Sequence, residues 1–215
     1  MATTAHSRRR DELGAYKRER ILEAAREVFA EHGLDRATLR QIAAAAGYVA
    51  GTLYLHFESK EAIYGALLAG SLDRLAAAVD AARGSGADSA FMAFHRYYAD
   101  NAEELDLGLY LFRGTGRRGL DPGLDQELND RLRAIVESLA STLAAATGLP
   151  WRDAHRETVS FASFMVGCLI MGGTGRLGML GYAGDDLVRR RLAEVLGAGR
   201  GRGLHASEDP HHVDA

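Results

Sequence analysis

The sequence contains 215 residues, of which 47% are hydrophobic and 26% are charged. This composition is typical of a soluble globular protein, and a chain of this length buries a large core without disulfides. The formal net charge is −3, which excludes a polycationic chain. The single cysteine, Cys168, excludes an intrachain disulfide and a cysteine-based zinc site. It is consistent with a cytoplasmic location.

The sequence predicts neither a secretory signal nor a membrane span. Arg8, Arg9 and Arg10 form a basic run near the N-terminus, but no apolar segment follows them. The longest uncharged stretch, residues 158–175, contains serines and four glycines. We interpret it as a buried helix rather than a membrane span, so no membrane partner is expected.

The composition favours an all-α fold. The chain has 37 alanines against 23 valines, isoleucines and threonines combined, and only three prolines. Alanine has the highest helix propensity, whereas the β-branched residues that favour strands are scarce here.

The N-terminal third predicts an arm followed by four helices. Residues 1–14 lack an apolar period and predict a flexible basic arm. A helical period begins near Lys17, and Gly33 is placed to end that helix. Thr38 and Gln41 have the spacing of a capping box, which predicts a short helix that ends at Gly47. A third helix is expected over residues 49–57, and Ser59 is placed to cap a fourth.

The remaining two thirds of the sequence predict further helices. Residues 83–89 and 114–123 are expected to be loops, and residues 197–215 a disordered tail. Apolar residues recur at helical spacing in the five segments 90–105, 107–113, 125–147, 152–171 and 185–196.

Two short helices joined by a tight turn at Gly47 predict a helix-turn-helix. In such a motif the second helix enters the major groove of DNA. If Leu53 and Phe57 point inward, then Thr52, Tyr54 and His56 point outward. A plain helical hairpin would produce the same pattern, so the pattern alone leaves both interpretations open.

The residues themselves are more specific. The stretches TLRQIAAAAG (38–47), GTLYLHF (51–57) and SKE (59–61) resemble the TetR family of bacterial transcriptional regulators, and the resemblance covers residues 15–75. It implies an N-terminal three-helix DNA-binding domain and a larger helical domain for ligand binding and dimerisation, over residues 76–196. It also implies a homodimer whose inducer releases it from a double-stranded DNA operator.

The resemblance also assigns DNA-contacting residues, with some contacts to the backbone and others to base edges. They are Thr38, Arg40, Gly47, Tyr48, Val49, Ala50, Thr52, Tyr54, His56 and Lys60. The family often has a serine and a lysine where this chain has Val49 and Ala50. A capping hydroxyl and a positive charge are therefore missing, and we expect weak phosphate contacts from this helix. The arginines of the arm are candidates to compensate.

The second domain offers candidates for a ligand pocket, because pockets between helices are mostly apolar with a few polar groups. The candidates are Phe91, Phe94, His95, Tyr98, Tyr110, Phe112, Arg113, Phe164, Met165 and Cys168. They favour an apolar or aromatic inducer. Aromatic residues and methionines at helical spacing are, however, more often part of an ordinary core.

The last two predicted helices resemble the dimer interface of the family. Ser160, Ser163 and Gly167 would permit close approach of helices, and an apolar stripe would supply contact. That stripe consists of Val188, Leu192, Val195 and Leu196. Packing within one chain is the alternative interpretation of the stripe.

Enzymatic interpretations find little support in the sequence. Two G-x-G-x-x-G strings, at 114–119 and 173–178, lack the strand and helix that a dinucleotide site requires, so no cofactor is expected. There is no G-x-S-x-G nucleophile motif. His211 and His212 lie in the predicted tail, and no metal site is expected. The sequence therefore predicts a ligand-responsive regulator, most simply a repressor. The alternative is a helical small-molecule-binding protein or enzyme with little sequence-specific DNA binding.

Overall fold

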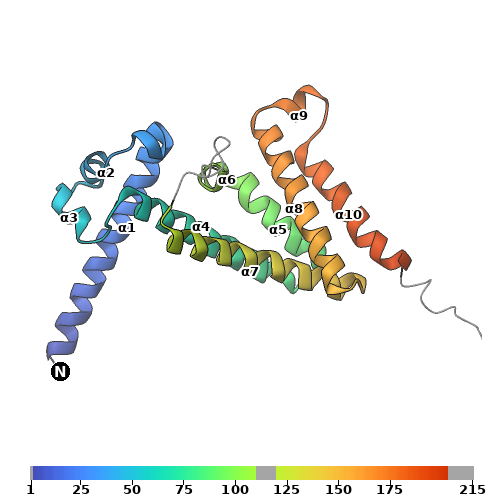
Figure 1. The fold of residues 1–215 in the computed structure, drawn as a ribbon, viewed down its shortest axis with the longest axis horizontal. Helices are drawn as coiled ribbons and strands as arrows, with labels where there is room; N and C mark the ends of the chain where they lie inside the picture. The colour runs from blue at the N-terminus through green and yellow to red at the C-terminus, as the bar shows by residue number, and fades with distance from the viewer. Residues whose placement is uncertain (1, 110–119, 203–215) are drawn as a thin grey trace, which may run out of the picture. The chain divides into compact units, whose positions relative to one another are not determined.

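The computed structural model describes residues 2–109 and 120–202, and the side chains of 8–109 and 120–197. These residues form helices and no strand, which confirms the all-α prediction (Figure 1). The helices are α1 (Ala2–Arg36), α2 (Leu39–Ala46), α3 (Ala50–Tyr54), α4 (Lys60–Arg83), α5 (Ala87–Asp100), α6 (Ala102–Leu109), α7 (Pro122–Thr147), α8 (Trp151–Gly173), α9 (Arg176–Met179) and α10 (Gly184–Arg202).

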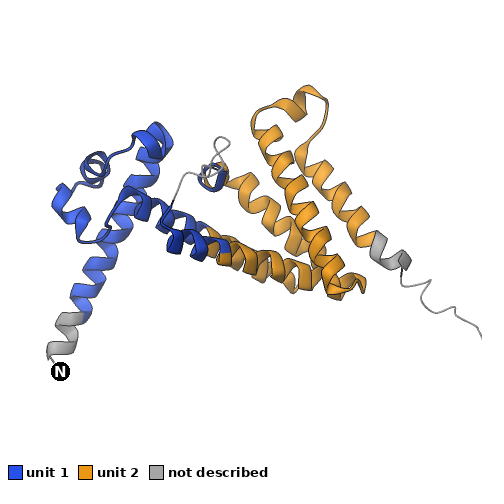
Figure 2. Ribbon diagram, viewed as in Figure 1, with its two compact units in different colours: residues 1–71, 106–129 blue, residues 72–105, 130–215 orange. Residues whose placement is uncertain are grey.

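The chain divides into two compact units (Figure 2). Unit 1 contains residues 1–71 and 106–129, and unit 2 contains residues 72–105 and 130–215. The first boundary lies close to the position predicted from the sequence. The inclusion of residues 106–129 in unit 1 was not predicted, because a sequence pattern does not show which segments return to an earlier core.

Unit 1 is built around one apolar core. α1, α2 and α3 each contribute one buried face, and the start of α4 closes the core. Ile21, Ile42, Leu53 and Ile63 are fully buried at its centre. Gly33 has a φ of 72° and a ψ of 159°, which no helix adopts, so it separates the long helix from one further turn that leads to α2. The predicted helix end at Gly33 is therefore confirmed.

The N-terminal segment differs from the predicted arm. Residues 2–14 continue α1 as helix. The segment contains two alanines, three arginines, one glutamate and one leucine, which favour helix, and it contains no proline. The absence of an apolar period shows only that the helix has no buried face here. It does not show that the helix ends.

Unit 2 is a helical bundle in which α8 packs against α10 and α5 (Figure 1). Phe91 and Phe161 make an edge-to-face contact at its centre, with ring centroids 5.2 Å apart. Val188, Leu192 and Val195 of α10 are buried in this unit. They were expected to supply a dimer interface. The structure instead places them in the core of their own chain.

The helix boundaries in this half of the chain mostly follow the sequence. α7 begins at Pro122, which tolerates the first helical position, and Gly148 follows α7 with a φ of 73°. The break between α5 and α6 lies at Asn101, whose side-chain amide donates to the carbonyl of Tyr97 at 2.7 Å. The sequence placed this break four to six residues later. The short helix α9 was not predicted, and α10 continues to Arg202, beyond the predicted start of the tail.

α4 is long and apolar enough to cross a membrane by length and composition. Half of its most apolar window is buried inside the structure. Leu67, Leu72, Leu75 and Val79 lie on that buried side. Burial of this face explains the hydropathy of α4 as that of a core helix.

Candidate nucleic-acid interface and ligand site

The first helix of the predicted motif begins with the capping box that the sequence indicates. The Thr38 hydroxyl accepts a hydrogen bond from the Gln41 amide at 3.2 Å, and the Thr38 amide donates to Gln41 Oε1 at 2.9 Å. Two backbone amides at the helix end thus have partners. Thr38 and Arg40 are both exposed at this end of α2. They are accessible to a DNA backbone.

The turn between α2 and α3 depends on Gly47. Its φ of 75° and ψ of 26° lie in the left-handed region, which other residues rarely adopt. The Tyr48 amide then donates to the carbonyl of Ala43 at 2.8 Å. The chain therefore changes direction at Gly47, and α3 begins shortly afterwards, at Ala50.

α3 presents an exposed face on the side opposite its buried contact. Leu53 is fully buried, whereas Val49 is 73%, Tyr54 60% and Leu55 83% exposed. Such large exposed side chains are unusual on a helix that serves only packing. Leu55 was not among the predicted contacts, although its position two residues after the buried Leu53 already placed it on the outer face.

The other predicted contacts on this segment are partly covered. Ala50, Thr52 and His56 are half-buried. Tyr48 is also half-buried and packs against the core of unit 1. Its ring thus supports the turn.

The start of α3 lacks a side-chain cap. Val49 occupies the N-cap position with an extended backbone, and its side chain makes no capping hydrogen bond. The sequence-based expectation of a missing capping hydroxyl is confirmed. A helix of five residues without a cap gains most of its stability from the burial of Leu53.

Lys60 has a structural role that the sequence did not predict. Its ammonium donates to the carbonyls of Leu34, Asp35 and Ala37 at 2.8, 3.0 and 3.2 Å. These carbonyls end the last turn before α2, so the ammonium joins the start of α4 to the start of the motif. The side chain is half-buried rather than extended into solvent. A lysine one residue after a capping serine gives no sequence signal for this contact.

Most predicted ligand-site residues pack as core in unit 2. Phe91, Phe94, Met165 and Cys168 are buried, whereas Phe164 is 38% exposed. Tyr98 makes edge-to-face contacts with Phe94 and Tyr97. Tyr110, Phe112 and Arg113 lie outside the described residues. Burial raises the pKa of the Cys168 thiol, which disfavours a reactive thiolate.

His95 is the most unusual of these residues. Its side chain is buried between α5 and α10, and Nε2 lies 3.5 Å from Asp185 Oδ1. Nδ1 has no hydrogen-bond partner among the described residues. Burial lowers the pKa of the imidazole below 6.5, while the Asp185 carboxylate acts in the opposite direction. The Asp185 carboxylate is also held by Arg189 at 2.6 Å.

A partly buried ion pair lies elsewhere in the structure. Arg74 Nη2 of α4 donates to Glu104 Oε1 of α6 at 2.6 Å. The Glu104 side chain is 7% exposed, so its charge depends on the guanidinium. Burial alone would lower the pKa of Arg74, but its interactions with Glu104 and Tyr97 together outweigh burial, and the net shift is upward. This pair, whose two residues both belong to unit 2, fixes the start of α6 against α4.

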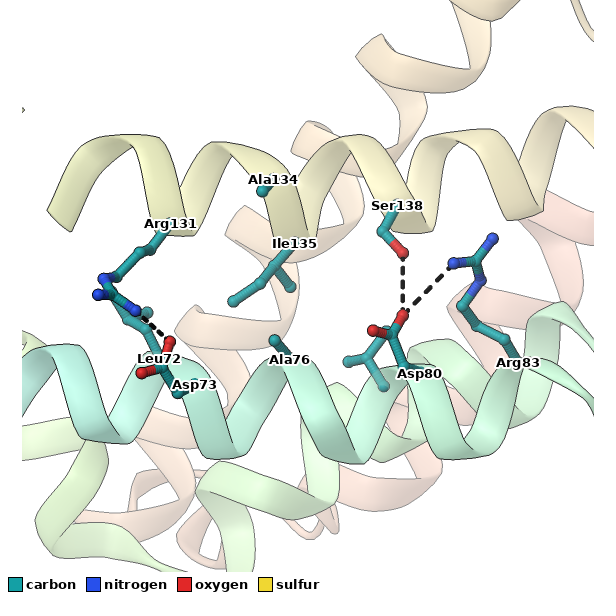
Figure 3. Close-up of a pocket in the computed structure, with 10 residues that line it drawn as sticks. Leu72, Asp73, Ala76, Asp80, Arg83, Arg131, Ala134, Ile135 and Ser138 are labelled. Atoms are coloured by element: carbon teal, nitrogen blue, oxygen red, sulfur yellow. Dashed lines mark hydrogen bonds and ion pairs between the residues drawn. The ribbon is translucent and has the colours of Figure 1, made fainter. Parts of the chain in front are cut away.

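An open groove of about 380 Å³ lies between α4 and α7 (Figure 3). Ala76, Ala134 and Ile135 lie along its middle, and ionic contacts close its ends. At one end Arg131 contacts Asp73, and at the other the Asp80 carboxylate contacts Arg83 and Ser138. None of the predicted ligand-site residues that the structure describes lines this groove.

Comparison with known proteins decides the identity of the N-terminal domain. Residues 21–67 match the model of the bacterial regulatory proteins of the tetR family. These residues include the core of unit 1, the Gly47 turn and all of α3. The N-terminal domain of this chain is therefore a DNA-binding domain of the TetR-family type.

Two curated relatives agree with this TetR assignment. The HTH-type transcriptional repressor KstR2 of Rhodococcus jostii (strain RHA1) is 44% identical over 73 residues, which cover 34% of this chain and 36% of the relative. The HTH-type transcriptional repressor Rv1474c of Mycobacterium tuberculosis (strain ATCC 25618 / H37Rv) is 42% identical over 67 residues, 31% of this chain and 35% of the relative. The matches thus span about a third of each relative, and both are named as repressors rather than enzymes.

Solved TetR-type structures match over more of the chain. The regulator FadR of Bacillus subtilis, solved in complex with stearoyl-CoA, has a TM-score of 0.62. It is 22% identical, and the alignment covers 84% of this chain and 98% of FadR. At this identity the likeness shows the fold alone: an N-terminal helix-turn-helix domain followed by a larger helical domain.

Proposed function

We propose that this protein is a cytoplasmic transcriptional repressor that binds a palindromic DNA operator as a homodimer and is released by a small-molecule inducer. The exposed face of α3, set by the Gly47 turn in a TetR-type domain, is the observation that carries the proposal. A helix in this position enters the major groove and contacts base edges.

The contacts divide by chemistry. Val49 and Ala50 offer methyl groups to thymine, and Thr52 offers a hydroxyl to a base edge. Thr38, Arg40, Tyr54 and His56 are assigned to the backbone, where they position the domain. Lys60 keeps its ammonium on three carbonyls and supports the domain rather than acting as a free phosphate contact.

The dimer forms through α8 and α10. α8 keeps an apolar face that the described residues of its own chain leave exposed, formed by Val159, Phe164, Ile170 and Met171. Ser160 and Ser163 are exposed on the same helix and leave room for close approach. A two-fold axis through this face would bring the same residues of two chains together.

The inducer is an apolar or aromatic molecule that binds in unit 2. The aromatic side chains of α5 and α8 supply apolar contact, and His95 and Tyr98 supply polar atoms among them. FadR of Bacillus subtilis was solved with stearoyl-CoA, so a long-chain acyl thioester is a reasonable first probe. Binding at these residues requires them to move apart, because they are packed together in this structure.

The test is fluorescence anisotropy of the full chain with DNA from its own upstream region, against random DNA as competitor. Specific binding is expected to exceed non-specific binding by about 10³-fold or more and to weaken steeply with salt. Tyr54→Ala is expected to weaken both kinds of binding, whereas Thr52→Ala reduces mainly the difference between them. Equal affinity for operator and random DNA across many sequences would favour the alternative of a ligand-binding protein with little DNA specificity.

A further inference from the structure

The basic N-terminal segment of α1 has no part in the function proposed above. Between residues 8 and 20 the sequence has six basic and three acidic side chains. Arg8, Arg9 and Arg10 are consecutive and all exposed. Consecutive residues on a helix point about 100° apart, so the three guanidinium groups spread over much of the helix circumference. They span an arc of about 200°, so at least one of them faces a partner that lies along that arc.

The helical conformation limits what these arginines can contact. An extended arm with three arginines would fit the minor groove of DNA, which is about 6 Å wide. An α-helix with its side chains is about 10–12 Å wide and does not enter that groove. Because residues 2–32 form one continuous helix, phosphate oxygens on the groove edge are the accessible partners.

α1 is held against the end of the DNA-contacting segment. The guanidinium carbon of Arg18 lies 4.9 Å from the centroid of the Phe57 ring, which follows α3. Arg10 precedes Arg18 by eight residues, which is about 12 Å along the helix axis. Figure 1 shows α1 continuing past α3 toward the N-terminus. The basic run therefore extends from the domain close to its proposed DNA-contacting helix.

We propose that Arg8–Arg10 form a helical phosphate clamp that binds the DNA backbone beside each operator half-site. This inference rests on the proposed DNA-binding function. The clamp supplies the positive charge that Val49 and Ala50 do not, and it carries no sequence preference. DNA is favoured over a membrane surface because a membrane-bound helix needs a broad apolar face, and Leu13 and Tyr16 are the only large exposed apolar side chains among residues 8–20.

The first test is the salt dependence of DNA binding by the triple variant R8A/R9A/R10A of the full chain. The loss of one to three phosphate contacts is expected to reduce the slope of log K against log salt by about 1 to 3. The reduction should be the same on operator and random duplexes, so the ratio of the two affinities should not change. R133A/R152A/R156A removes the same charge from exposed sites in unit 2 and is expected to keep the wild-type slope.

The second test disrupts the helical conformation of the segment while keeping its three arginines. Gly14 has open space around the position of a Cβ atom, so Gly14→Ala preserves the helix, whereas Gly14→Pro breaks it without changing any charge. In Gly14→Pro the slope of log K against log salt is expected to fall as it does in the triple variant. In Gly14→Ala the slope is expected to equal that of the wild type. A wild-type slope in the proline variant would overturn the helical clamp.

The outcomes separate the two proposals. If R8A/R9A/R10A binds the operator specifically and its slope of log K against log salt equals that of the wild type, the clamp is wrong and the proposed function stands. No preference of the wild type for any DNA sequence overturns the proposed function itself. If the wild type binds phosphatidylserine vesicles, the triple variant does not, and DNA slopes are equal, the basic segment serves a membrane surface and the clamp is wrong.

Discussion

The side chain of Lys60 stabilises the N-terminal domain through contacts that the sequence does not reveal. The Lys60 ammonium contacts three carbonyls that end the turn before α2. Without the ammonium, two of these partly buried carbonyls would need water instead. Hydrogen bonds to charged groups contribute more than neutral ones, so this one side chain has a large local effect.

We expect Lys60→Met to destabilise the segment around α2 by about 1–2 kcal/mol. Amide hydrogen exchange in residues 39–46 should become about 5- to 30-fold faster as a result. The control is Lys17→Met, which removes the same charge from α1 and should leave that exchange unchanged. Equal exchange in Lys60→Met and the wild type would show that the carbonyl contacts add no stability.

His95 predicts a pH dependence at the residue scale. Burial lowers its folded-state pKa below 6.5, so the unfolded chain binds a proton at a higher pH than the folded chain does. Its contribution to stability is therefore present above about pH 6.5 and is lost as the pH falls toward the folded-state pKa. The loss is at most about 1.4 kcal/mol per pH unit.

Urea unfolding followed by Trp151 fluorescence measures this loss, because the only tryptophan lies in unit 2 with His95. His95→Gln should lose less stability between pH 7.5 and 5.5 than the wild type. His32→Gln, a variant in unit 1, should follow the wild type. Identical pH profiles for His95→Gln and the wild type would contradict this account of the buried imidazole.

At the scale of elements, local signals were predictable and long-range partners were not. Thr38, Gln41 and Gly47 act through their own neighbours in the chain, so their roles follow from spacing alone. The stripe on α10 shows that one face of the helix is buried, but not whether the same chain or a second copy covers it. From the sequence we expected a second copy to cover Val188, Leu192 and Val195. In the structure these residues are buried within their own chain.

Other parts of the chain show which structural features an apolar pattern does not predict. Residues 2–14 were predicted as an arm because they lack a buried face, yet their helix propensity is sufficient for the helix to continue. The role of Lys60 depends on carbonyls more than 20 residues away, which no local pattern contains. Among the candidate site residues, exposure of Tyr54 followed from the period of α3, whereas the half-burial of Tyr48 depends on packing against unit 1.

The capping box gives a prediction at this scale. Thr38→Ala should destabilise α2 by about 1 kcal/mol, because the Gln41 amide loses its acceptor. In Thr38→Ala the first amides of α2 should exchange hydrogen faster. DNA binding should also weaken, because α2 positions α3. Thr38→Ser keeps the hydroxyl and should retain both properties. An unaffected Thr38→Ala variant would show that water replaces the cap at no cost.

For the whole molecule, the uncovered face of α8 predicts a dimer. The wild type should sediment with about twice the chain mass of 23.2 kDa. Phe164→Glu places like charges across the proposed two-fold face and should give monomers with weaker operator binding. Leu132→Glu introduces the same charge at an exposed site on α7 and should remain dimeric. A monomeric wild type, or a dimer unchanged by Phe164→Glu, would contradict an interface through α8.

The proposed repressor must recognise a specific DNA sequence with two-fold symmetry. In vitro selection with the full chain on a library of randomised duplexes tests this recognition, because the library does not depend on which operator the chain binds. We expect enrichment of one palindromic sequence that binds about 10³-fold or more tightly than its scrambled version at physiological salt. If successive rounds enrich no sequence, and selected pools bind no better than the starting library, the chain is not a sequence-specific DNA-binding protein.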